Sequence, residues 1–73
     1  MHVGETIRAL RESSGMTQKQ LAEKTGISRG AVMQFELGYK LPSLPTLNML
    51  AIALGTTPAA LLEGSGDTKE ARV

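Results

Sequence analysis

The apolar residues of this chain recur every three to four positions, which is the spacing of a helix that buries one face. The first such segment runs from Val3 to Ser13, where Ile7 and Leu10 lie on one stripe among polar residues. Ser14 and Gly15 follow it, and both residue types favour a turn over a helix. The pattern therefore predicts a first helix over residues 3–13.

The next two segments are short, and a tight turn at Gly26 joins them. The earlier one begins at Thr17, whose hydroxyl can accept a hydrogen bond from an unpaired backbone N–H, and Gln20 completes a capping-box pattern. The later one begins at Ser28, a second N-cap residue, and ends near Gly38. Two short helices around a tight turn are the layout of a helix-turn-helix, whose second helix enters the DNA major groove.

The second helix of this motif has two unlike faces. The residues on its inward face are Ala31, Val32 and Phe35. The residues on its opposite face are Arg29, Gly30, Met33, Gln34 and Leu37. One face is therefore expected to pack on a core, and the other to meet solvent or a partner.

The rest of the pattern predicts two further helices. Pro42 and Pro45 bracket the start of the first of these, with Ser43 as its N-cap and Gly55 at its end. Its periodic apolar residues are Leu44, Leu47, Leu50, Ala51 and Leu54. A last short helix begins with Pro58, and its apolar residues are Ala60, Leu61 and Leu62.

Residues 64–73 show no apolar period. A segment of this kind cannot bury enough apolar surface to offset the entropy of ordering it. We therefore expect one domain over residues 1–63 and a disordered C-terminal tail over residues 64–73. The total length of 73 residues is consistent with a single small domain.

Composition excludes several classes of function. There is no cysteine, and His2 is the only histidine, so we expect no disulfide and no metal site. The sequence offers no Ser/His/Asp set and no phosphate-binding glycine loop, so we expect neither enzymatic activity nor a cofactor. No apolar run approaches the ~20 residues that span a bilayer, and the N-terminus lacks a signal core. These features favour a cytoplasmic protein without a membrane partner.

The order and spacing of several stretches resemble one family. IRALRESSGMTQKQLAEKTGIS, VMQFELG, LPSLPTLNMLAIALG and TPAALL are together similar to the Cro/C1-type helix-turn-helix repressors, the xenobiotic-response-element-like group. The resemblance covers roughly residues 4 to 62. It implies an all-α, compact five-helix lambda-repressor-like domain that binds operator DNA, usually as a two-fold dimer.

In this family the outer face of the third helix reads the bases. The resemblance gives as base-reading candidates Ser28, Arg29, Gly30, Met33 and Gln34. An arginine can bond guanine bidentately, a glutamine can bond adenine, and an apolar side chain can contact a thymine methyl. For each residue the alternative is a solvated surface side chain, and Gly30 can either allow close approach of the backbone to DNA or simply leave the reading to its neighbours.

The resemblance also implies roles for three further groups of residues. The phosphate-binding candidates are Thr17, Gln18, Lys19, Tyr39 and Lys40. Arg11 and Glu36 align with a buried structural ion pair. The dimer-interface candidates are Leu41, Leu44, Pro45, Pro58 and Leu61, although apolar residues there can equally belong to the core. Leu37 departs from the family, which commonly has asparagine at that position.

The sequence therefore predicts a sequence-specific transcriptional regulator, most simply a repressor that binds a palindromic operator as a homodimer and associates with the nucleoid through DNA. No sensor domain is recognisable, so no small-molecule ligand is expected. A phage repressor, a controller of a restriction–modification operon and an antitoxin all fit. The alternative from a different class is a protein-interaction module with this fold and little sequence-specific DNA binding, which the net charge of only +1 and the apolar Met33 and Leu37 favour.

Overall fold

The computed structural model describes residues 3–63 and contains five helices within them. They are α1 (Val3–Ser13), α2 (Gln18–Thr25), α3 (Arg29–Leu37), α4 (Leu44–Leu54) and α5 (Pro58–Glu63). The all-α, five-helix prediction is confirmed. His2 and the predicted tail over residues 64–73 lie outside the described residues.

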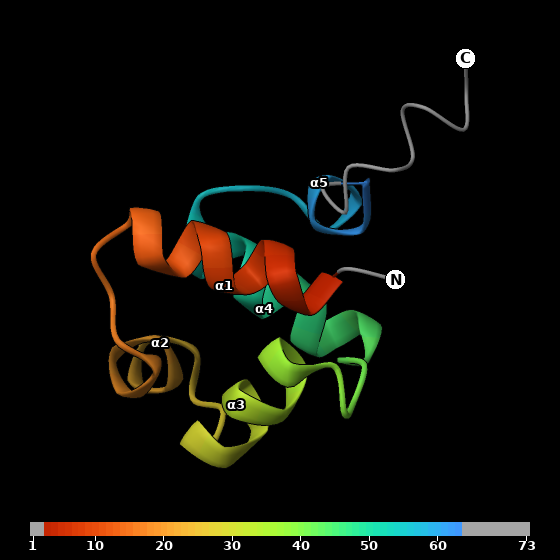
Figure 1. The fold of residues 1–73 in the computed structure, drawn as a ribbon. Coiled ribbons are helices and arrows are strands. Elements are labelled where there is room, and N and C mark those ends of the chain that lie inside the picture. Colours follow the sequence, from red (N-terminus) through yellow and green to blue (C-terminus); the bar gives the residue numbers. More distant parts are fainter. Residues whose placement is uncertain (1–2, 64–73) are drawn as a thin grey trace.

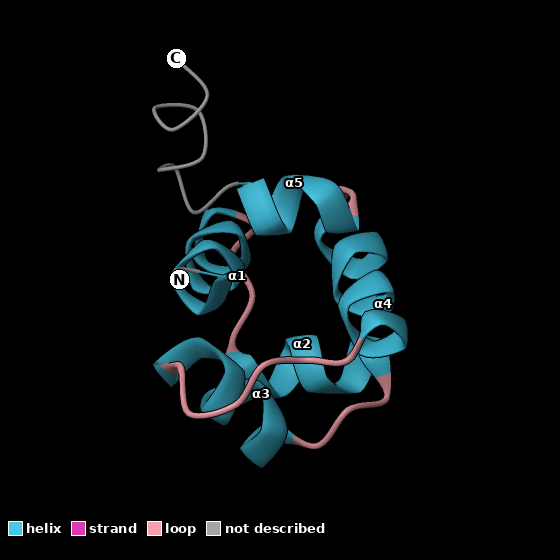
Figure 2. Ribbon diagram, turned by 90° about the vertical axis from the view of Figure 1, so that its right-hand side faces the viewer, coloured by secondary structure: helices cyan, strands magenta, loops and turns pink. Residues whose placement is uncertain are grey.

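The helices pack around one core (Figures 1 and 2). In Figure 1, α2 and α3 lie together at the bottom of the molecule, α5 lies at the top, and α1 passes between them in front of α4. The buried apolar residues come from all five helices, and they are Val3, Ile7, Leu21, Ala22, Val32, Phe35, Leu47, Leu50, Ala51, Leu54 and Leu61. Leu10 and Ile27 are partly buried and pack against this cluster.

Local sequence signals fix the helix ends. The side chains of Thr17, Ser28 and Ser43 accept hydrogen bonds from the backbone N–H groups of α2, α3 and α4 respectively, as the sequence predicts for N-caps. Gly26 ends α2 with φ of 78°, a left-handed conformation that a side chain with a Cβ would disfavour. The chain therefore changes direction between α2 and α3 over the three residues 26–28.

Two leucines named as dimer-interface candidates differ in their exposure. Leu44 belongs to the apolar period of α4, but its side chain is 74% exposed because it lies at the first turn, beyond the core. Leu61, a candidate for the dimer interface, is 0% exposed. Its side chain is part of the core of its own chain, so that assignment is wrong: a residue with no accessible surface cannot contact a second subunit.

Among residues 3–63, no helix has both the length and the apolar character that crossing a membrane requires.

Candidate nucleic-acid interface

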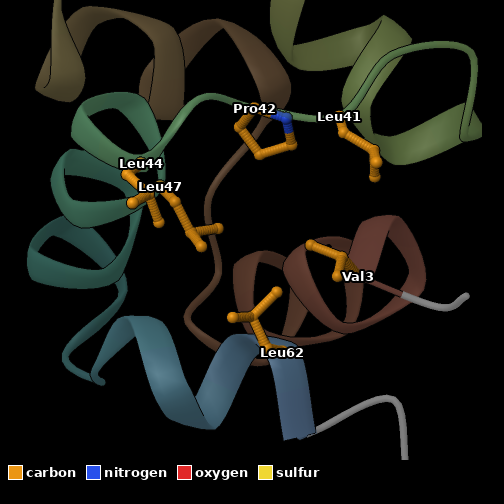
Figure 3. A pocket seen from close by; sticks show the side chains of 6 residues that line it. All are labelled: Val3, Leu41, Pro42, Leu44, Leu47 and Leu62. Carbon is orange, nitrogen blue, oxygen red and sulfur yellow. The ribbon is translucent and has the colours of Figure 1, made fainter.

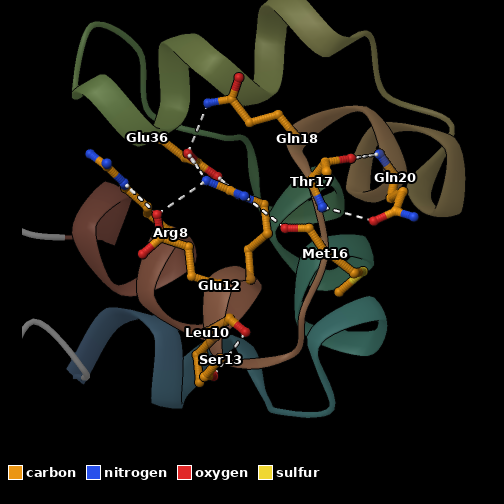
Figure 4. Close-up of polar contacts among 10 residues, drawn as sticks. Arg8, Leu10, Glu12, Ser13, Met16, Thr17, Gln18, Gln20 and Glu36 are labelled. Carbon is orange, nitrogen blue, oxygen red and sulfur yellow. Dashed lines mark hydrogen bonds and ion pairs between the residues drawn. The ribbon is translucent and has the colours of Figure 1, made fainter.

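Hydrogen bonds hold both ends of α2, the first helix of the motif. The capping box pairs Thr17 N–H with Gln20 Oε1 at 2.9 Å and Gln20 N–H with Thr17 Oγ1 at 3.0 Å (Figure 4). At the other end of α2, the Thr25 hydroxyl lies 2.8 Å from the Leu21 carbonyl oxygen and also accepts from Ile27 N–H at 3.3 Å. Sequence reasoning missed this role of Thr25, which ties the last turn of α2 to the residue after Gly26.

The inner face of α3 fixes its orientation on the domain. Val32 is completely buried and Phe35 nearly so, while Ala31 is half-buried against the core. Ser28 Oγ accepts from Ala31 N–H at 3.1 Å and caps the helix. The predicted inward face of α3 is therefore confirmed.

The opposite face of α3 is open to solvent. Arg29 and Gly30 are exposed, Met33 and Leu37 are 44% and 54% exposed, and Gln34 is half-buried. A Cβ added at Gly30 would meet nothing within 4 Å, so packing within the domain does not require glycine at this position. The structure thus gathers four of the five base-reading candidates on one accessible helical surface, and the fifth, Ser28, caps its N-terminus.

A buried ion pair joins α1 to α3. Arg11 Nε lies 2.6 Å from Glu36 Oε2, and a second guanidinium nitrogen donates to Glu36 Oε1 at 3.1 Å. The two side chains are only 10% and 2% exposed. The hydrogen bond to Glu36 raises the pKa of the Arg11 guanidinium above its ordinary value, so the residue stays charged. The pair that the resemblance implies is therefore present.

Two further contacts extend this pair into a network (Figure 4). Arg11 also donates to the Met16 carbonyl oxygen at 2.8 Å, which fixes the segment that leads into α2. The Gln18 amide donates to Glu36 Oε1 at 3.0 Å. The network connects the start of α2 to the end of α3, and sequence reasoning, which treated Gln18 only as a phosphate ligand, missed its contact with Glu36.

α1 also approaches the end of α3 through its backbone. A Cβ at Gly4 would overlap the Phe35 carbonyl oxygen and lie 2.9 Å from that of Glu36. Real Cβ atoms do not come so close to backbone oxygen, so only glycine fits here without movement of the helices. A glycine in the first turn of an amphipathic helix was the available signal, and sequence analysis did not use it.

The remaining phosphate candidates lie at the two ends of the motif. Thr17 and Lys19 are exposed at the N-terminus of α2, where backbone N–H groups and the positive end of the helix dipole favour anions. Tyr39 and Lys40 are exposed in the loop after α3, and both of their N–H groups bond the Gln34 carbonyl oxygen. The loop is thus anchored to α3.

An apolar surface lies away from the motif, where α1, α5 and the start of α4 meet. Figure 3 shows its side chains facing one another around a pocket lined by Val3, Leu41, Pro42, Leu44, Leu47 and Leu62. Val3 and Leu47 form its buried floor, whereas Leu41 and Leu44 are largely exposed. Pro45 is exposed and Pro58 half-buried, so Leu61 is the only dimer candidate that the structure removes.

A compact five-helix domain with a helix-turn-helix of this geometry is a lambda-repressor-like DNA-binding fold. The pattern of the helix-turn-helix family matches residues 7–61, and the chain belongs to this family, of Cro/C1 type. Its relatives are DNA-binding regulators and not enzymes, in agreement with the expectation from the sequence.

Two curated proteins illustrate what the chain is similar to in sequence. It is 42% identical over 62 residues to the immunity repressor protein of Bacillus phage phi105, covering 85% of this chain and 43% of the relative. It is 36% identical over 62 residues to the SPbeta prophage-derived HTH-type transcriptional regulator YonR of Bacillus subtilis, covering 85% and 57%. The chain thus spans about half the length of these curated relatives.

Solved structures agree with the fold. The DNA-binding domain of the P22 C2 repressor is similar with a TM-score of 0.82 and 34% identity, over 92% of this chain and 86% of that one. The structure of SinR, the master regulator for biofilm formation, in complex with DNA is also similar to this chain. Its TM-score is 0.79 and its sequence identity 26%, over 82% of this chain and 97% of that one.

Proposed function

We propose that this protein is a transcriptional repressor that binds a palindromic operator as a homodimer and inserts α3 into the major groove. The observation that carries the proposal is the accessible face of α3, which presents Arg29, Met33 and Gln34. The other face of this helix packs on the core. The similarity to the phage immunity repressor supports repression, and the similarity to SinR in its complex with DNA supports DNA binding.

In this proposal Arg29 supplies the main base contact. It is exposed on the first turn of α3, and the N-terminal residues of a recognition helix are those that meet base edges. A guanidinium bonded to guanine O6 and N7 discriminates against other bases by about 1–3 kcal/mol. Gln34 is half-buried and lies further along the helix, which suits it to contacts at the edge of the half-site.

Phosphate contacts would position the helix without specifying sequence. The N-terminus of α2 offers Thr17 and Lys19 for one phosphate, and the loop after α3 offers Tyr39 and Lys40 for another. Because Gln18 donates to Glu36, its amide would couple phosphate binding to the orientation of α3. With few cations at these positions, one domain makes few phosphate contacts, and a dimer doubles them.

The dimer would form through the apolar surface of Leu41, Leu44 and Pro45, with Pro58 at its edge. Leu41 and Leu44 are large aliphatic residues that a monomer leaves in water, and they flank a pocket that can receive a partner side chain. A two-fold axis at this surface would make the contact self-complementary, and a dimer of this class places its two recognition helices one DNA turn apart. A DNA-bound regulator of this kind acts in the cytoplasm, at the nucleoid.

Selection of bound duplexes from a random DNA pool by the purified protein tests this function. The expected result is a palindrome whose half-sites are about one turn apart. Arg29→Ala should then relax the preference at one base pair, whereas Lys40→Ala should weaken binding to all sequences alike and reduce its salt dependence. If no motif is enriched, the repressor proposal is wrong.

The alternative function is a protein-interaction module, such as an antitoxin. The exposed apolar side chains of Met33 and Leu37 favour it, because apolar surface on a helix also suits a protein partner. It predicts weak DNA binding without sequence preference and a stable complex with another protein. The same selection experiment separates the two functions.

A further inference from the structure

The centre of the exposed face of α3 is apolar. Arg29, Met33 and Leu37 follow one another at intervals of four residues, so they form a single row along the helix. About half of each apolar side chain in this row is accessible. This row therefore leaves two apolar side chains in contact with water beside a single cation.

The neighbours of this row leave it uncovered. Gly30 contributes no side chain beside it, and the Gln34 side chain is half-buried at its flank. The one acidic residue of α3, Glu36, points into the domain, where it bonds Arg11. Within the described residues, therefore, no charged side chain of α3 other than Arg29 lies on the face that Met33 and Leu37 occupy.

The major groove offers few partners for such side chains. The base edges there carry nitrogen and oxygen donors and acceptors, and the apolar group among them is the C5-methyl of thymine. An aliphatic side chain pressed on a polar edge strips water from it without supplying a hydrogen bond, which is unfavourable. The same side chain on a methyl group buries apolar surface on both partners, which is favourable.

We propose that Met33 and Leu37 read the C5-methyl groups of pyrimidines in the operator. This inference rests on the proposed function and adds the chemical group recognised, and it makes Leu37 a determinant of specificity. The group is thymine in ordinary DNA and 5-methylcytosine in modified DNA. Since the two residues are about 6 Å apart along the helix, the methyl groups lie in one half-site, about two base pairs apart if α3 follows the groove.

The test uses the selected operator and single-atom changes in the DNA. Deoxyuridine replaces thymine at one position at a time, which removes the methyl group and leaves base pairing unchanged. The loss of a fully buried methyl group predicts binding about fourfold weaker at each of two positions, and no change at the others. In a second arm, cytosine at either position is compared with 5-methylcytosine, and the methylated duplex should bind more tightly by a similar factor.

Variants assign each methyl group to a side chain. Met33→Ala should bind the thymine and deoxyuridine duplexes equally at one position while keeping the effect at the other, and Leu37→Ala should do the reverse. Ile52→Ala is the matched control, because Ile52 is an exposed aliphatic residue on α4, outside the motif, and this variant should keep both effects. All three side chains are exposed, and thermal melting confirms that each variant is folded.

The outcomes are distinguishable. Failure to select any motif overturns the proposed function, and the inference with it. A selected palindrome whose deoxyuridine duplexes bind as tightly as thymine duplexes overturns the inference alone. Methyl effects that persist in both Met33→Ala and Leu37→Ala also overturn it, because another side chain would then read the group.

Discussion

Removal of Arg11 should destabilise this domain strongly, because it leaves the buried Glu36 carboxylate without its cation. Arg11→Ala removes two hydrogen bonds to Glu36 and one to the Met16 carbonyl oxygen. It leaves a carboxylate that is 2% exposed, with the Gln18 amide as its remaining side-chain donor. An uncompensated buried charge of this kind costs about 3–5 kcal/mol.

That magnitude is large for so small a protein. About 60 ordered residues provide a free energy of unfolding of roughly 3–9 kcal/mol. For a domain of this size 1 kcal/mol corresponds to a shift of about 4–8 °C in the melting temperature, so Arg11→Ala should lower it by about 12–40 °C. Thermal melts followed by far-ultraviolet circular dichroism measure the shift, and urea titration measures the change in free energy.

A matched control lies on the same helix. Arg8 pairs with Glu12 at 3.1 Å, but these side chains are 60% and 54% exposed. An exposed pair four residues apart contributes about 0.3–0.5 kcal/mol, so Arg8→Ala should shift the melt by no more than a few degrees. The comparison separates the effect of burial from the loss of an arginine on α1.

The double replacement Arg11→Met with Glu36→Leu tests the electrostatic reasoning. It removes both charges and fills their volume with apolar atoms, which should recover much of the stability that either single change loses. Equal melting of Arg11→Ala and the wild type would refute the reasoning, and so would a double replacement as unstable as the two single changes added together. In either case the ion pair would contribute little to the free energy of unfolding beyond the packing of α1 against α3.

Three further predictions follow from the packing and the surfaces. Gly4→Ala should destabilise the domain by about 1–3 kcal/mol, because its Cβ would overlap the Phe35 carbonyl oxygen, whereas Gly30→Ala, with open space around it, should be neutral or slightly stabilising in the same urea titration. Ser28→Ala should lower the free energy of unfolding by about 1 kcal/mol through loss of the N-cap of α3, and a Ser28→Asp variant that fails to restore it would contradict this assignment. Leu44→Lys should leave the melting temperature of the monomer unchanged but abolish dimeric binding to the full operator in a gel-shift titration, and unchanged binding would exclude this surface from the interface.

Local features of the sequence determined the helices and where they begin and end. Thr17, Ser28 and Ser43 each cap a helix through a hydrogen bond to a backbone N–H three residues later, so the signal and its partner lie within one turn. The left-handed turn at Gly26 is local in the same sense. The inner and outer faces of α3 follow from its own period of 3.6 residues.

Only the tertiary structure decided which apolar residues the core contains and which contacts orient α3. Leu44 and Leu61 both fit a helical period, yet one is exposed and the other wholly buried, because burial depends on where the neighbouring helices end. The contact of Gly4 with Phe35 and that of Gln18 with Glu36 join residues 31 and 18 positions apart. Spacing within one helix cannot encode such pairs, since the packing angle between helices sets them.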